Sequence, residues 1–498
     1  MKVKNCGCLM AIVWMSVSCQ QNVPTSNPDI YTLEEPLDTQ HYQQAPFEWH
    51  VSPRHDYSKT YVTKFFMSQA LFDPEYMGRF KMRDNGQQTN YMNCEQALNT
   101  IKGMDAITLG LPKIVYLVGW QYLGHDSKYP AFFEGNEAIK RPQDKDALES
   151  LRWLMEEGKK YHTAVSFHVN LFDAYPDSPL FDEYLQEDVL AKDEKGELVH
   201  SDWGYKVCYS AEWEKGLLQK RLDSLCCLLP IADVGTLHVD AFHNDIPEPF
   251  VNENGDIDIR GKSPISPWHG YTKEQDMAVQ RNIVKYLDSK GIDVTIEGGF
   301  SERDMDGYFP MYWHYGMLDH VMSLTAAQAC GGNNYIPAFG TNINGESLFR
   351  GHPTLDEALD VFKREFCKQT LVCQYLNTFG RVALVQDDNH NSIGVLEDGV
   401  RTMVKDNKMH VAKDGQPLVE GGDVFVPAVW LGNDAIIAYS EEGYENRTWT
   451  VPAGVSLSRK AKAWLIDANG RTEFNAFNRQ KRQITLTLAP GEMVLIQG

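Results

Sequence analysis

The chain has 498 residues, of which 43% are hydrophobic and 23% are charged. This balance is typical of a globular protein with enough apolar material for a large core. The formal net charge is −21 and the sequence pI is about 5.1. Binding to a nucleic-acid backbone requires clustered Lys and Arg, and the sequence has no long basic run. Nucleic acid is therefore not an expected partner.

The N-terminus has the features of an export signal. Lys2 and Lys4 precede an apolar stretch, residues 8–17, that is too short to span a membrane comfortably. Small residues then lead to Cys19, as in a bacterial lipoprotein signal. We predict a lipoprotein-type signal peptide over residues 1–19 with lipidation at Cys19; simple cleavage nearby is the alternative. The protein would then be exported as a periplasmic or outer-membrane lipoprotein that meets the membrane only through its lipid anchor. Residues 20–59 follow as a polar tether and N-terminal segment.

Seven cysteines follow Cys19, and several of them lie in apolar, helix-like segments. Their number is odd and no Cys-x-x-Cys pair occurs, so we predict mostly small buried hydrophobic residues rather than metal ligands or disulfides. They are Cys94, Cys208, Cys226, Cys227, Cys330, Cys367 and Cys373.

Residues 60–380 alternate between apolar, strand-like runs and amphipathic helices. Such alternation is typical of a parallel sheet covered by helices, and it predicts an α/β fold, a (β/α)8 TIM-like barrel. The expected strands are residues 61–67, 113–120, 163–170, 236–240, 293–297 and 320–324. The expected helices are residues 94–108, 144–161 with Asp144 as N-cap, 212–229, 273–290, and 354–377 opening with a capping-box pattern.

Near Gly380 the sequence changes character. Short strands such as residues 424–430, 435–439 and 483–488 are separated by turns that contain Asp-Gly or Asn-Gly. This pattern predicts a C-terminal antiparallel β-sandwich over residues 381–498.

Two carboxylates stand where apolar strands end, Asp240 and Glu297. In β/α barrels the working residues lie at the carboxyl ends of the strands. We count these strands as the fourth and fifth, so the two acids would face each other across a short gap. Cleavage of a glycosidic bond requires two carboxyl groups, and a separation of about 5 Å predicts retention of configuration. The pair therefore predicts a retaining glycoside hydrolase.

Polar and aromatic residues also follow the strand ends. They can hydrogen-bond to sugar hydroxyls or stack on the apolar face of a sugar. The candidates for substrate binding are Trp120, Gln121, His125, Asp126, His168, Asn170, Trp203, Tyr205, His238 and Asn244.

Four of these segments resemble glycoside hydrolase family 101, the endo-α-N-acetylgalactosaminidases, which is related to the exo-acting family 129. They occur in the family's order between about residues 60 and 380: residues 118–127, residues 167–176, Trp203-Gly204-Tyr205 and His238-Val239-Asp240. The sequence departs from the family at Tyr205, where a Trp is common, and in the longer interval between Asp240 and Glu297.

The resemblance implies a retaining mechanism on α-linked N-acetylgalactosamine of mucin-type O-glycans. It implies that Asp240 is the nucleophile, that His125, Asp126 and His168 bind the sugar, and that Trp203 and Tyr205 frame the pocket. Glu297 is assigned as acid/base from its strand. No cofactor is required for this chemistry, and a structural calcium ion is compatible with it.

Three alternatives stay open. The sugar could differ, for example an α-galactoside. The chain could be a non-catalytic glycan-binding lipoprotein. A metal-dependent hydrolase could use His238, Asp240 and His243, because alternation along a strand places the first two on one face.

Overall fold

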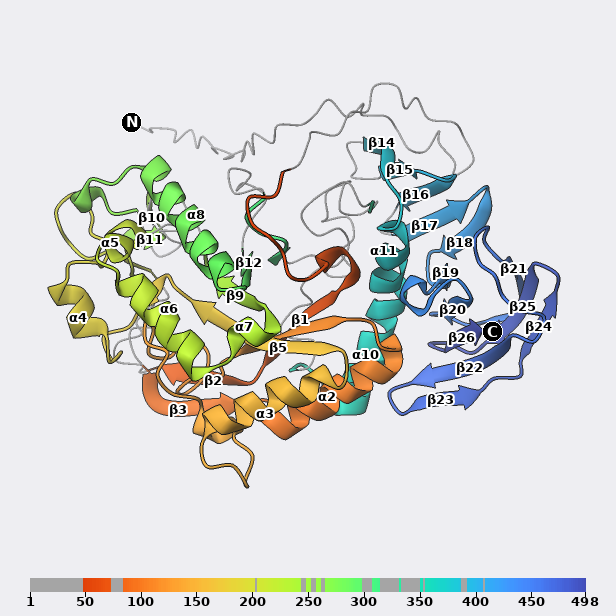
Figure 1. Ribbon diagram of the computed structural model, residues 1–498, viewed down its shortest axis with the longest axis horizontal. Coiled ribbons are helices and arrows are strands. Elements are labelled where there is room, and N and C mark those ends of the chain that lie inside the picture. The colour runs from red at the N-terminus through yellow and green to blue at the C-terminus, as the bar shows by residue number, and fades with distance from the viewer. Residues whose placement is uncertain are drawn as a thin grey trace, which may run out of the picture.

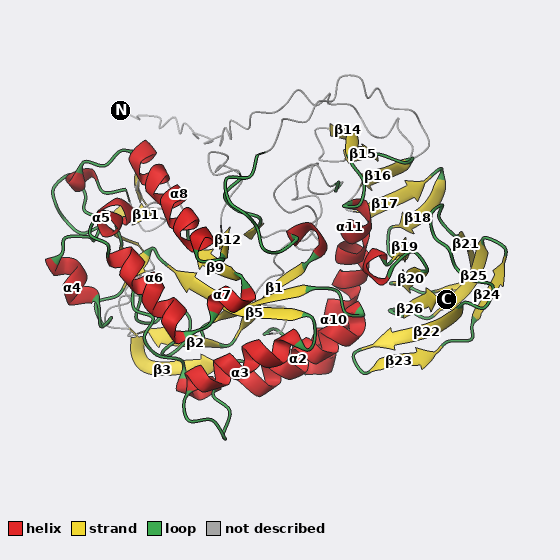
Figure 2. Ribbon diagram, viewed as in Figure 1, coloured by secondary structure: helices red, strands yellow, loops and turns green. Residues whose placement is uncertain are grey.

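The structure is a computed structural model that describes residues 48–72, 84–201, 204–242, 248–251, 257–260, 265–297, 307–313, 331–332, 350–352, 354–386, 392–405 and 408–498. Its described residues form two regions (Figure 1). The first contains a parallel sheet with helices packed along it, and the second, blue in Figure 1, consists of antiparallel strands. Figure 2 shows the helices gathered around the first region.

The parallel sheet has the strand order β1-β4-β5-β9-β12-β13 within the described residues. These strands are β1 (Tyr61–Phe66), β4 (Lys113–Val118), β5 (Thr163–Asn170), β9 (Thr236–Asp240), β12 (Asp293–Glu297) and β13 (Tyr312–Trp313). Asp240 and Glu297 thus end the fourth and fifth strands of this order, as predicted. Closure into an eight-stranded barrel stays a prediction, and the expected strand at residues 320–324 lies outside the described residues.

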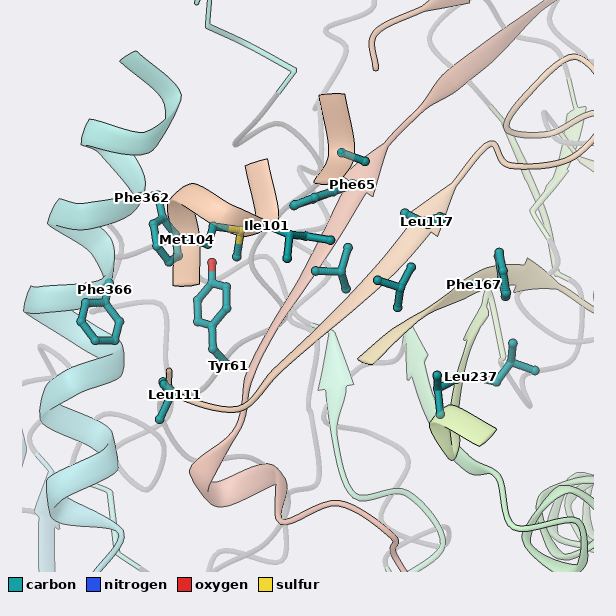
Figure 3. Packing of buried hydrophobic residues seen from close by; sticks show 14 of the residues in the cluster. Tyr61, Phe65, Ile101, Met104, Leu111, Leu117, Phe167, Leu237, Phe362 and Phe366 are labelled. Atoms are coloured by element: carbon teal, nitrogen blue, oxygen red, sulfur yellow. The ribbon is translucent and has the colours of Figure 1, made fainter. Parts of the chain in front are cut away.

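The outer face of this sheet is apolar and packs against helices. Figure 3 shows side chains from four successive strands beside residues of α2 (Cys94–Thr108) and α10 (Leu355–Glu365). All are at most 1% exposed and belong to one cluster: Phe65, Leu117, Phe167, Leu237, Ile101, Met104 and Phe362. At about 25 cal/mol per Å² of apolar surface, this burial is the main force that holds helices and sheet together.

The inner face of the sheet changes along the strands. Near the amino ends it is closed by a small apolar cluster that includes Val62, Ile114, Tyr116 and Met311. Toward the carboxyl ends the inward positions become polar and stay buried: Lys64, Ser166, His168, His238 and Asp240. Because alternate residues of a strand face opposite sides, this polar set shares one side of the sheet.

Helix ends explain two differences from the predicted elements. The helix α3 (Ala147–Lys159) is capped by Asp146, whose carboxylate accepts from the backbone N–H of Glu149, and not by Asp144. Asp144 instead accepts hydrogen bonds from Arg141 and Ser150. The single helix expected over residues 212–229 is two helices, α5 (Tyr209–Glu214) and α6 (Leu217–Leu228), because Gly216 between them adopts a left-handed φ of 72°.

The other elements of the first region complete the cover of the sheet and its rim. The helices are α4 (Phe181–Gln186), α7 (Ile231–Val234) and α8 (Lys273–Ser289). The small antiparallel pairs and ribbons are β2 (Ser68–Phe72) with β3 (Asp84–Asn90), β6 (Asp173–Ala174) with β8 (Gly204–Lys206) and β7 (His200–Ser201), and β10 (Glu248–Val251) with β11 (Ile257–Arg260).

The predicted helix at 354–377 is one continuous helical rod. Thr354 caps α10, a wider π-helical turn spans Phe366–Thr370, and α11 (Leu371–Leu376) follows. This rod and α2 border the C-terminal region. Trp430 donates its indole N–H to the carbonyl of Thr108 at 3.1 Å and meets Phe366 edge to face. The two regions therefore share a packed boundary.

The C-terminal region is built from two antiparallel sheets, among the residues described. The larger contains β14 (Arg381–Gln386), β15 (Ser392–Leu396), β16 (Val400–Lys405), β17 (Lys408–Lys413), β18 (Gln416–Glu420), β19 (Asp423–Pro427), β20 (Ala435–Ser440), β26 (Met493–Gln497), β22 (Lys462–Asp467) and β23 (Gly470–Glu473). The smaller contains β21 (Tyr444–Thr450), β25 (Gln483–Leu488) and β24 (Phe477–Gln480). Phe425 of one sheet stacks on Trp449 of the other at 5.3 Å, within a shared apolar cluster. Two sheets over one core are the sandwich arrangement that the turns predicted.

Four cysteines, Cys94, Cys208, Cys367 and Cys373, are buried thiols, as predicted, whereas Cys227 is exposed and Cys226 is intermediate. Cys330 lies outside the described residues. Within the parts of the chain that the structure describes, no helix has both the length and the apolarity to cross a bilayer.

Candidate active site at the carboxyl end of the parallel sheet

Asp240 is the last residue of β9 and lies at the centre of the polar inner face. It is 9% exposed, and Asn170 of β5 is its register partner. The next residue, Ala241, has a positive φ of 49°. Such strain in a non-glycine residue costs about 1–3 kcal/mol and is often found at functional sites. The chain thus turns sharply away immediately after the carboxylate.

Two side chains of β5 hold one oxygen of Asp240. His168 Nε2 lies 3.3 Å from Asp240 Oδ2, and Asn170 Nδ2 donates to the same oxygen at 3.4 Å. Both residues are only 1% exposed. Asn170 also accepts from the backbone N–H groups of Phe172 and Asp173 through its Oδ1. Both contacts are therefore made to Oδ2 of Asp240.

His238 lies beneath Asp240 and is fully buried. Burial, together with the charge of Lys64 and the neighbouring His168, holds the pKa of His238 well below its usual range, so the ring is neutral. Its Nδ1 lies 2.9 Å from Thr295 Oγ1, and its ring packs at 5.3 Å from that of His168. His238 therefore supports His168 from below.

The loop after β4 brings His125 and Asp126 to the same place. Gly119 has φ +74°, and a Cβ there would meet the carbonyl oxygen of Ser68 at 1.9 Å, so only glycine fits. This close approach allows the His125 N–H to donate to the Ser68 carbonyl at 2.9 Å. His125 Nε2 then lies 3.3 Å from Asp126 Oδ1, and its ring meets His168 at 5.1 Å. Gly119 thus allows the loop to place His125 beside His168.

One residue predicted to contact sugar is enclosed in the core instead. Trp120 is 0% exposed, lies between Phe132 and Phe167 in the outer core, and donates its indole N–H to the His168 carbonyl at 3.0 Å. The prediction that it stacks on sugar is corrected, because neither ring face is accessible; the residue anchors the strand that carries His168. Gln121 is fully buried, as are His168 and His238, and its role in sugar binding stays a prediction.

A second group near Asp240 was missed from the sequence. Asp173 accepts from Asn170 Nδ2 at 2.8 Å and pairs with Lys206 at 2.5 Å. Burial raises its pKa to about 6 against the opposing effect of Lys206. Tyr129 and Tyr175 are stacked at 6.1 Å and fully buried. Burial, and then the charge of Asp126, raises the pKa of both phenols. The sequence signal that could have identified Asp173 is its position three residues after Asn170, where β5 ends.

The remaining predicted site residues are only partly placed. Glu297 ends β12 one residue after Ile296, which pairs with Val239, but its side chain lies outside the described residues. Trp203, His243 and Asn244 also lie outside them. Tyr205 is partly buried, and its ring contacts Phe181 and His200. The structure therefore brings together Asp240, His168, Asn170, His238, His125 and Asp126.

The described residues contain a group of side chains that could hold a metal ion. The predicted set of His238, Asp240 and His243 stays a prediction, because His243 lies outside the described residues. Ligand atoms of His125, His168 and Asp240 all lie within 4.8 Å of one another. His238 is not one of these three residues; its Nδ1 lies 2.9 Å from Thr295 Oγ1. The donor set of two imidazoles and a carboxylate suits a borderline transition metal better than calcium, which prefers oxygen ligands.

Residues 79–249 match the model of a family described as endo-α-N-acetylgalactosaminidase, glycoside hydrolase family 101. This segment is about one third of the chain and contains His125, His168 and Asp240. The match confirms the resemblance expected from the motifs and supports a glycoside hydrolase that binds carbohydrate. A comparison with curated proteins gave no match.

Three solved structures have a distant similarity to this chain. Ligand-free α-N-acetylgalactosaminidase NagBb from Bifidobacterium bifidum is 12% identical, with a TM-score of 0.45 over 71% of this chain and 58% of that one. An α-amylase from Geobacillus thermoleovorans is 9% identical, with a TM-score of 0.41 over 89% and 100%. A GH36 α-galactosidase AgaA from Geobacillus stearothermophilus is 10% identical, with a TM-score of 0.39 over 82% and 53%. The chain spans less than two thirds of NagBb, and all three similarities are too distant to assign an activity.

Proposed function

We propose that this protein is a retaining glycoside hydrolase that cleaves α-linked N-acetylgalactosamine, as found in mucin-type O-glycans, by double displacement. The observation that most strongly supports this proposal is the set of contacts that Asp240 makes. A carboxylate at the end of a central parallel strand is held through one oxygen by His168 and Asn170, inside the segment that matches family 101.

Each residue has a role in this proposal. Asp240 attacks the anomeric carbon through Oδ1 and forms a glycosyl-enzyme, while Glu297 protonates the leaving oxygen. Water then attacks the anomeric carbon, Glu297 accepts its proton, and the sugar leaves with its original configuration. His125 and Asp126 bind sugar hydroxyls, and Trp203 and Tyr205 frame the pocket. Neutral His238 keeps His168 in place.

The proposal includes the wider organisation of the chain. The parallel sheet belongs to a closed (β/α)8 barrel over residues 60–380, followed by the sandwich over residues 381–498. The position of Glu297 supports the acid pair, since its strand lies next to that of Asp240. Cys19 carries the lipid that anchors the exported protein, a periplasmic or outer-membrane lipoprotein of the bacterial type.

The test is hydrolysis of three substrates: an aryl α-N-acetylgalactosaminide, an aryl α-galactoside and an aryl glycoside of the core-1 disaccharide. We expect turnover of the first or third, with a loss of about a thousandfold or more in Asp240→Asn. Turnover of the galactoside alone would mean that the substrate is an α-galactoside and not an α-N-acetylgalactosaminide. Sugar binding without turnover of any substrate would make the protein a glycan-binding lipoprotein.

A further inference from the structure

His125, His168 and Asp240 come from three separate segments, and their ligand atoms converge to within 4.8 Å of one another. His168 Nε2 and Asp240 Oδ2 are 3.3 Å apart. Two ligands of a tetrahedral zinc ion, each at about 2.0 Å from the metal, are themselves separated by about 3.3 Å. This pair therefore already has the spacing that zinc requires.

His125 can supply the third ligand with a small movement. All three ligand atoms lie within 4.8 Å of one another, so an approach of the His125 ring by at most about 1.5 Å reaches tetrahedral spacing. Its side chain is 15% exposed, close to the 13% of Asp240, whereas that of His168 is 1% exposed. Asp126 Oδ1 contacts His125 Nε2 at 3.3 Å, the kind of carboxylate–imidazole contact that orients histidines at metal sites.

We propose that His125, His168 and Asp240 form a reversible binding site for Zn²⁺ or a similar borderline transition metal, and that the bound metal blocks the proposed glycosidase. The donor atoms, two imidazole nitrogens and one carboxylate oxygen, match the preference of such metals. The metal would engage Asp240, which then cannot attack the anomeric carbon. Only this inhibitory consequence rests on the proposed function; the binding itself does not.

The test begins with binding of the metal alone. The full chain, freed of metal by chelator and dialysis, is titrated with ZnCl₂ by calorimetry, and with CoCl₂ to follow the visible absorption of tetrahedral cobalt. We expect one ion per chain. His125→Gln and His168→Gln each remove a nitrogen ligand, and Asp240→Asn replaces the charged oxygen at constant size, so each should weaken binding about tenfold or more.

His162→Gln is the matched control. His162 is an exposed histidine that also contacts a carboxylate, Asp105, at 3.1 Å, but it is not part of the group of three, so binding should be unchanged. Thermal melts of all variants separate lost ligands from lost folding. Asp240→Asn keeps the shape of the side chain and therefore tests the site even if a histidine variant unfolds.

Activity measurements complete the test. If the protein is a glycosidase, Zn²⁺ should inhibit it and a chelator should restore it. The proposal is overturned if the wild-type chain binds no Zn²⁺, if the variants bind it as tightly as wild type, or if a chelator abolishes activity and Zn²⁺ restores it. The last result would make the metal a cofactor. An inactive protein that binds one Zn²⁺ would refute the proposed function and leave the site intact.

Discussion

Asn170 is the residue whose replacement most sharply separates stability from chemistry. Its Oδ1 accepts from two buried backbone N–H groups at 2.7 and 2.8 Å, while its Nδ2 donates to Asp173 Oδ2 at 2.8 Å and to Asp240 Oδ2 at 3.4 Å. Asn170→Ala leaves both N–H groups without their acceptor. Each costs about 1–3 kcal/mol, so the free energy of unfolding should fall by about 2–6 kcal/mol.

Asn170→Asp keeps the oxygen that accepts from the two backbone N–H groups. It replaces the Nδ2 donor with a carboxylate oxygen, which then faces the carboxylate oxygens of Asp173 and Asp240. Two unit charges 3.4 Å apart repel by about 5 kcal/mol at an effective dielectric constant of about 20. Since the three acids cannot all ionise easily, the acidic limb of kcat/KM should move up by about one pH unit or more, with activity at neutral pH reduced. The stability of this variant should stay closer to wild type than that of Asn170→Ala.

The assays are denaturant unfolding and the pH profile of kcat/KM on the best substrate. Asn93→Asp is the matched control, because Asn93 caps α2 through its Oδ1 far along the chain from β9. It adds the same charge and should leave the pH profile unchanged. A wild-type pH profile for Asn170→Asp, or wild-type stability for Asn170→Ala, would refute the role given to this side chain.

Three further predictions concern the fold and the export of the chain. Asp276 is buried against Ser210, and burial raises its pKa to about 7 from 3.8; folding therefore takes up a proton, and stability falls as pH rises from about 4 to about 7. Asp276→Asn should gain at most about 4 kcal/mol over wild type at pH 8 and little at pH 4, measured by urea unfolding; equal gains at both pH values would contradict this. Gly119→Ala should lower the melting temperature by several degrees or prevent folding, because its Cβ would overlap the Ser68 carbonyl; a wild-type melting curve would count against the tight turn. In a bacterial host, Cys19→Ser should abolish labelling with radioactive palmitate, and labelling that persists would remove Cys19 as the lipidated residue.

The order of helices and strands could be predicted from the sequence, because the apolar runs and the helix-capping signals point to the same elements. Apolar runs bounded by helix signals gave β4, β5, β9 and β12 within a few residues, and the acids at strand ends followed from the same pattern. One error arose where a single residue decides between two possible helix caps. Asp144 and Asp146 are both suitable caps, and only the pairing of Asp144 with Arg141 removes it from that role.

The partners inside the site could be predicted only in part. Trp120 follows a strand as a sugar-stacking residue would, but its position on the outer side of the sheet depends on the turn at Gly119. The contacts of Asp173 with Lys206 join residues 33 positions apart, through the pairing of β6 with β8. No local pattern specifies such a pair. The ring contact between His125 and His168 also depends on residues far apart in the sequence, because the loop after β4 is positioned by its hydrogen bond to the Ser68 carbonyl.

The central claim is that Asp240 becomes covalently bonded to the sugar. The most direct measurement is azide rescue of Asp240→Gly on an aryl α-N-acetylgalactosaminide, with the anomeric configuration of the product read by NMR. Asp240 as nucleophile predicts that azide restores turnover and yields the β-glycosyl azide, while wild type releases the α-sugar first. A wild-type product that appears first as the β-anomer, or full activity of Asp240→Gly without azide, would contradict the account.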